Sequence, residues 1–126
     1  MNQGLLAVGA QGCCSKNSHG RGKVHVFRRD GDRWEEEEIL VSEDRDPNDR
    51  FGRAISAGEN RILVGAPFEN DLLPEESHAR SGGAYVFECS DGTWRQTHKI
   101  SSRSIAPGDN FGWSVALEGD VALVSC

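Results

Sequence analysis

The chain has 126 residues, 37% hydrophobic and 27% charged, a composition typical of one ordinary globular domain. Its net charge of -6 and isoelectric point near 5.1 argue against a nucleic-acid partner, because its 14 basic residues are scattered rather than gathered on one face. No segment has the roughly 20 consecutive apolar residues of a membrane span, and the first ten residues lack a signal-peptide pattern.

The clearest feature of the sequence is an internal repeat, which a fold prediction must take into account first. Four pairs of similar segments have the same separation along the sequence, 60 residues (109 minus 49). The pairs are 49–52 with 109–112, 63–64 with 123–124, 26–27 with 86–87, and 34 with 94. In addition, Val8-Gly9-Ala10 matches Val64-Gly65-Ala66. The chain therefore contains three copies of one unit, and the first and last copies are incomplete.

The predicted elements follow these copies in chain order. Residues 1–48 are expected to form the second, third and fourth strands of a first copy, and residues 109–126 the first two strands of a third copy. The complete copy, residues 49–108, contains four short β-branched and aromatic runs, at residues 51–57, 61–66, 83–88 and 93–100. The connections 58–60 and 89–92 are hairpin-short and contain Gly, Asn and Asp, so these strands should pair antiparallel.

The first strand of the complete copy is apolar on both faces. Alternation puts Phe51, Ile55 and Ala57 on one face and the small residues Gly52, Ala54 and Ser56 on the other. The third copy repeats this pattern. Such a strand is suited to lie between two sheets that stack face to face.

The last strand of each copy is strongly polar after Trp34 and Trp94, and is predicted to be the exposed outer strand. An apolar inner strand, a polar outer strand and a long regular period describe a radially repeated blade. We therefore expect an all-β fold, a partial β-propeller of four-stranded antiparallel blades with about two blades plus a fragment. The incomplete copies suggest a fragment of a longer protein or a subunit that assembles with others.

Phe51-Gly52 followed by Val64-Gly65-Ala66-Pro67 resembles the FG-GAP signature of the repeats that form the integrin α-subunit propeller. Residues 82–87 followed by Trp94 resemble the calcium-free subgroup of that family. The resemblance implies a non-catalytic segment that serves protein interaction, adhesion-like recognition or a structural role, in an extracellular or cell-surface location. It also implies that the partners are another protein or further repeats of the same protein.

The resemblance does not extend to a calcium site. Integrin-type repeats often hold calcium in an Asp-rich loop between the first two strands, and the equivalent residues 58–60 and 118–120 are short and poor in carboxylates. Residues 44–49 begin like a calcium loop, but Asp49 occupies the position of the turn glycine and Ile55 that of the bidentate glutamate. We therefore expect no calcium, no other metal and no cofactor, and a solvated loop at residues 44–49.

No catalytic constellation is present in the sequence, so we expect the chain not to be an enzyme and assign no catalytic residues. Cys13 and Cys14 share a predicted loop with His19, and ordinary loop thiols are favoured there over a soft-metal or redox site. Two alternative functions stay open. In the first, the chain is an accessory propeller fragment of a larger secreted enzyme. In the second, it is a module that binds a carbohydrate or another ligand.

In an up-and-down sheet alternate connections emerge at the same end. The long connections expected here therefore share one rim: residues 11–21, 42–50, 68–81 and 101–110. Binding residues are often found on long loops held by a rigid scaffold. The candidate binding residues on this rim are Asp71, Glu75, Arg80 and Arg103. The alternative is that residues 68–74 are a tolerated insertion without a binding role.

Overall fold

The computed structural model describes residues 4–12, 14–15, 18–19, 22–43, 49–68, 81–101, 104–106 and 108–126, and the regular elements in these segments are β-strands. The prediction of an all-β fold is confirmed. Within the same segments, no helix has the length and apolar character needed to cross a membrane.

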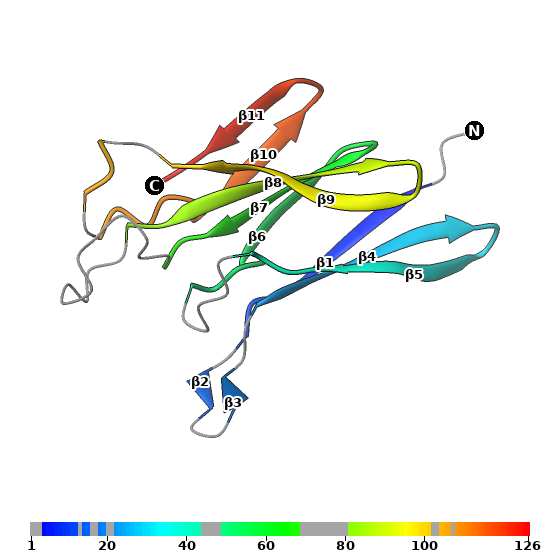
Figure 1. Cartoon of the computed structure of the whole chain (residues 1–126), viewed down its shortest axis with the longest axis horizontal. Helices are drawn as coiled ribbons and strands as arrows, with labels where there is room; N and C mark the ends of the chain where they lie inside the picture. The colour runs from blue at the N-terminus through cyan, green and yellow to red at the C-terminus, as the bar shows by residue number, and fades with distance from the viewer. Residues whose placement is uncertain are drawn as a thin grey trace.

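The strands form three open antiparallel sheets and one small hairpin (Figure 1). The first sheet contains β1 (Leu5–Ala10), β4 (Lys23–Asp30) and β5 (Arg33–Leu40). The second sheet contains β6 (Ala54–Ala57), β7 (Arg61–Ala66), β8 (Gly83–Ser90) and β9 (Thr93–Ile100). The third contains β10 (Val115–Glu118) and β11 (Val121–Val124). The separate hairpin, β2 (Cys14–Ser15) with β3 (Ser18–His19), lies within the predicted loop at residues 11–21.

The three sheets are stacked in chain order, with the second between the other two (Figure 1). Strand β6 packs against β1 on one side and β10 on the other, as its two apolar faces predict. We call the face of a sheet that points toward the preceding sheet its rear face, and the opposite face its front face. The core forms between the front of the first sheet and the rear of the second, from Val24, Val26, Leu40, Phe51, Ile62, Val64, Ala66, Tyr85, Phe87 and Trp94.

The first strand of the second sheet is shorter than predicted. It begins at Ala54 and not at residue 51, because Gly52 has a φ of 88° and the Arg53 N–H donates to the Arg50 carbonyl at 3.1 Å. Such a φ is open to glycine and strained for most other residues. We call residues 50–53, and their counterparts 110–113 in the third copy, the Phe-Gly turns.

The copies agree even in their irregularities. The β4–β5 ladder shifts register between Val26 and Phe27, and the β8–β9 ladder shifts between Val86 and Phe87. Each shift leaves one residue of the outer strand without a cross-strand partner, a β-bulge. In the first sheet that residue is Glu37, whose side chain reaches the second sheet.

Candidate interaction surfaces

Each Phe-Gly turn rests on glycines of the preceding sheet. A Cβ on Gly9 would overlap the carbonyl oxygen of Gly52, and a Cβ on Gly65 would overlap that of Gly112, at separations well under 3.0 Å. Gly22 and Gly82 meet the carbonyl oxygens of Phe51 and Phe111 in the same way. The contact between successive sheets is therefore backbone against backbone, and glycine at these positions makes it possible.

A second contact links the outer edges of the first two sheets. The indole N–H of Trp94 on β9 donates to Glu37 Oε2 at 3.1 Å, and Arg28 Nε donates to the same oxygen at 3.0 Å. The Arg28 guanidinium also lies 5.9 Å from the centroid of the Trp94 ring. The bulge at Glu37 thus supplies the acceptor that a buried tryptophan N–H needs.

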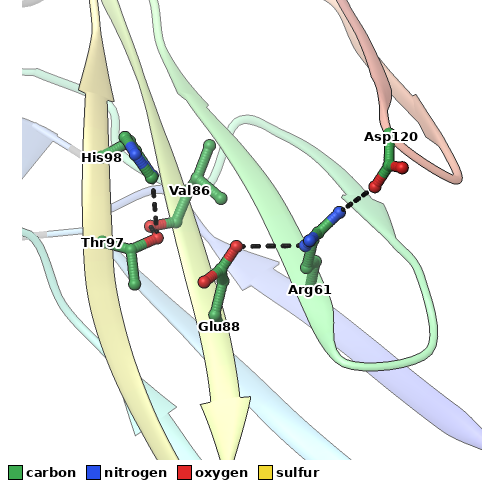
Figure 2. A network of polar contacts seen from close by, with 6 residues as sticks. All are labelled: Arg61, Val86, Glu88, Thr97, His98 and Asp120. Carbon is green, nitrogen blue, oxygen red and sulfur yellow. Dashed lines mark hydrogen bonds and ion pairs between the residues drawn. The ribbon is translucent and has the colours of Figure 1, made fainter.

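A third contact links the second and third sheets through Arg61 (Figure 2). Arg61 Nε donates to Glu88 Oε1 at 3.0 Å, and Arg61 Nη1 donates to Asp120 Oδ1 at 2.7 Å. The hydrogen bond to Asp120, followed by the negative charge of Glu88, raises the pKa of Arg61 above its ordinary value. Asp120 is almost fully exposed, so solvent screens this pair strongly. Nearby, the Leu117 N–H donates to Ser56 Oγ at 2.9 Å, which anchors β10 on β6.

The comparison with protein families agrees with these repeated contacts. The model described as FG-GAP repeat matches residues 34–87 and 94–126, which is more than half of the chain. The chain belongs to the FG-GAP repeat family. No curated protein sequence matches it.

The third FG-GAP copy lacks the glycine that receives a Phe-Gly turn. The N–H of Gly52 donates to the Gly65 carbonyl at 3.2 Å, and the N–H of Gly112 donates to the Ser125 carbonyl at 2.9 Å. Ser125 therefore occupies the position of Gly65, with a Cβ where a following Phe-Gly turn would place an oxygen. A further sheet on this side must place its Phe-Gly turn differently.

The two ends of the FG-GAP stack leave apolar faces uncovered. On the rear of the first sheet, Leu6, Val8 and Trp34 are 41%, 46% and 46% exposed. On the front of the third sheet, Val121 and Leu123 are 61% and 66% exposed. An open groove of about 470 Å³ runs along this second face, lined by Ala116, Leu117, Glu118, Val121 and Leu123.

The predicted binding residues Asp71, Glu75, Arg80 and Arg103 lie outside the described residues, as do Cys13 and residues 44–48 of the candidate calcium loop. The backbones of Cys14 and His19 pair in the β2–β3 hairpin. Within the described ranges, no group of three or more His, Cys, Asp or Glu side chains is placed to hold a metal ion.

The structure places four other side chains at the predicted long-loop rim: Arg50, Arg53, Phe68 and Trp113. Arg50 lies 4.4 Å from the centroid of the Phe68 ring, and Arg53 lies 3.9 Å from the centroid of the Trp113 ring. The two rings are 6.5 Å apart and tilted by 43°. Sequence reasoning missed this group because the repeat pairs Arg53 with Trp113 as equivalents and gives no sign that they touch.

Proposed function

We propose that this chain is a non-catalytic segment of an FG-GAP β-propeller, and that its two open faces receive further FG-GAP sheets while its long-loop rim contacts a protein partner. The supporting observation is a comparison of equivalent residues. Leu63, on the front of the second sheet, has 0% exposure, whereas its counterpart Leu123 on the third sheet has 66%. The two residues are equivalent in the repeat, but β7 has the third sheet in front of it and β8 beside it, whereas β11 has neither. A following sheet, together with the remaining strands of the third sheet, would cover Leu123.

The opposite end supports the same proposal. Ile62, Val64 and Trp94 on the rear of the second sheet are 0%, 0% and 7% exposed. Their counterparts on the first sheet, Leu6, Val8 and Trp34, form the exposed apolar face described above. Exposed apolar side chains gathered on one face usually mark an interaction site, although this face also carries the His25–Glu36 pair. The occupant with the matching shape is another sheet of the same family, because sheets of this chain cover the equivalent faces.

The division of the chain into partial, complete and starting blades, at residues 1–48, 49–108 and 109–126, belongs to this proposal. So does the assignment of Asp71, Glu75, Arg80 and Arg103 to partner binding on the long-loop rim. A purely adhesive or structural role needs only this rim and the open faces. The proposed location is the cell surface or the extracellular space, in line with the integrin-type members that the sequence resembles.

Sedimentation velocity over a range of chain concentrations tests the open faces. The chain is expected to associate reversibly, because each end exposes an apolar face that the same fold covers elsewhere. Val8→Lys and Leu123→Lys should each weaken association, since each places a charge on one open face. Glu59→Lys, in the exposed turn between β6 and β7, is a control that changes charge away from both faces.

The variants Val8→Lys and Leu123→Lys also show which face of one chain packs on which face of another. If one end of the stack packs on the other end, Val8→Lys and Leu123→Lys each retain one intact face, and a mixture of the two should form a dimer. A chain that stays monomeric at every concentration, with a cooperative unfolding transition, would contradict the proposal. Association that neither substitution weakens would contradict it as well.

A further inference from the structure

Arg50, Arg53, Phe68 and Trp113 form a cation–aromatic cluster that bridges the second and third sheets. Arg50 and Arg53 belong to one Phe-Gly turn and Trp113 to the next, while Phe68 follows the end of β7. The Phe68 N–H donates to the Asp49 carbonyl at 3.2 Å, and the Trp113 N–H donates to the Asn110 carbonyl at 3.0 Å. Backbone hydrogen bonds thus fix the main chain from which both rings project.

Both guanidinium groups lie against aromatic rings. A guanidinium that rests on a ring keeps its N–H donors in its own plane, where they are available to a second ligand. Among the described residues, the ion pairs of Arg28 and Arg61 involve Glu37, Glu88 and Asp120, and Arg50 and Arg53 form none. The cluster therefore presents two positive charges that no described carboxylate neutralises.

The described part of the fold does not satisfy all the donors of Arg53. Its Nε is buried and has no hydrogen-bond partner among the described residues. A buried donor without an acceptor is rare in folded proteins and is destabilising. The ring beneath it, Trp113, is 45% exposed, so the cluster is open to solvent on one side.

We propose that this cluster is a carboxylate-binding site, in which the forked donors of Arg50 and Arg53 grip acidic side chains above the rings of Phe68 and Trp113. The planar guanidinium fork matches a carboxylate in a way that an ammonium group does not. The chain has a net charge of -6, which repels an acidic ligand at long range, so binding requires a local site. The inference rests on the proposed recognition function of the rim and names the chemistry of its partner.

Acidic side chains could come from a partner or from this chain, and one titration distinguishes the two sources. The probe is a fluorescein-labelled, end-blocked hexaglutamate peptide, followed by fluorescence anisotropy at low salt. The unmodified chain is expected to bind it, and Arg50→Gln with Arg53→Gln should weaken binding by about tenfold or more. Arg53→Lys should give an intermediate loss because lysine lacks the fork. Arg33→Gln, at the β4–β5 turn, removes one positive charge elsewhere and should leave binding unchanged, whereas Arg53→Gln alone should weaken it.

The second arm neutralises the acidic residues that follow Phe68, by Glu69→Gln, Asp71→Asn, Glu75→Gln and Glu76→Gln together. If a partner supplies the carboxylate, peptide affinity stays the same in this background. If the chain supplies it, affinity rises several-fold and remains dependent on Arg50 and Arg53. The proposal is overturned if the doubly substituted cluster binds the peptide as well as the intact cluster in both backgrounds. Because sedimentation measures the open faces separately, failure of one proposal does not imply failure of the other.

Discussion

Gly65 lies against the carbonyl oxygen of Gly112, so closely that a single Cβ at Gly65 would overlap it. The same relationship joins Gly9 to Gly52 one sheet earlier. A repeated contact without side chains explains how consecutive sheets keep a fixed spacing, since the backbones themselves are in contact. The glycines of the FG-GAP signature therefore act in pairs, one in the Phe-Gly turn and one in the strand beneath it.

Replacing Gly65 by alanine should lower the free energy of unfolding by about 1–3 kcal/mol, the usual cost of inserting a methyl group where there is no space. Urea denaturation followed by tryptophan fluorescence measures this change. Gly58→Ala is the matched control, because a Cβ at Gly58 meets the Leu117 side chain at 3.5 Å and the Arg61 carbonyl oxygen at 3.7 Å, both ordinary contacts. An unchanged unfolding midpoint for Gly65→Ala would mean that the third sheet does not rest on Gly65 in solution.

The hydrogen bond from Trp94 to Glu37 should couple the first two sheets. A double-mutant cycle with Trp94→Phe and Glu37→Gln is expected to give a coupling free energy of about 0.5–1.5 kcal/mol. Trp34 is the repeat counterpart of Trp94 but lies on the open rear face. The control cycle, with Trp34→Phe and Glu37→Gln, should therefore give a coupling free energy near zero. Equal couplings in the two cycles would show that the effect does not come from contact between sheets.

The ion pair between Arg61 and Asp120 should contribute little to the free energy of unfolding, and that contribution should decrease as salt is added. Asp120→Asn is expected to lower the urea midpoint slightly in dilute buffer and to have no effect in 1 M salt, where the screening length falls to about 3 Å. Glu59→Gln, in the adjacent turn, removes the same charge without an ion pair in the structure and serves as the control. If Asp120→Asn still lowered the urea midpoint at high salt, the Asp120 side chain would act through packing and not through its charge.

The pH dependence of this pair follows from the raised pKa of Arg61. A basic group whose pKa is higher in the folded chain than in the unfolded chain contributes stability that is fully present below the unfolded pKa and is lost only above the folded one. Both values lie far above neutral pH for arginine. Unfolding measured between about pH 7 and pH 9 should therefore show no contribution from Arg61 titration, and Arg61→Met should not change the slope of stability against pH in that interval.

The repeat in the sequence predicted much of the fold, because period and alternation determine which strands pair and which faces are buried. Ser56 and Ile55 point to opposite sides of β6, as alternation predicts: Ser56 accepts the Leu117 N–H and Ile55 packs on the core. Alternation fails at Gly52, where a positive φ replaces the predicted extended backbone with a turn. A single glycine in the sequence does not reveal which of these conformations it adopts.

The candidate sites were harder to predict because they depend on contacts between copies. Arg53 and Trp113 are equivalent in the repeat, yet they touch because consecutive sheets are offset. Glu37 reaches Trp94 through a β-bulge that the charged run at residues 35–38 does not reveal. The predicted rim residues Asp71, Glu75, Arg80 and Arg103 remain predictions.

The unfolding free energies of Leu63→Ala and Leu123→Ala, measured at the lowest workable chain concentration, test the stacking of FG-GAP sheets most directly. The two leucines are equivalent in the repeat, and only Leu63 is followed by another sheet and flanked by an outer neighbouring strand, β8. Leu63→Ala is predicted to cost about 2–5 kcal/mol, as for a buried leucine, and Leu123→Ala less than about 0.5 kcal/mol, as for an exposed residue. Equal costs for the two substitutions would contradict the stacked arrangement.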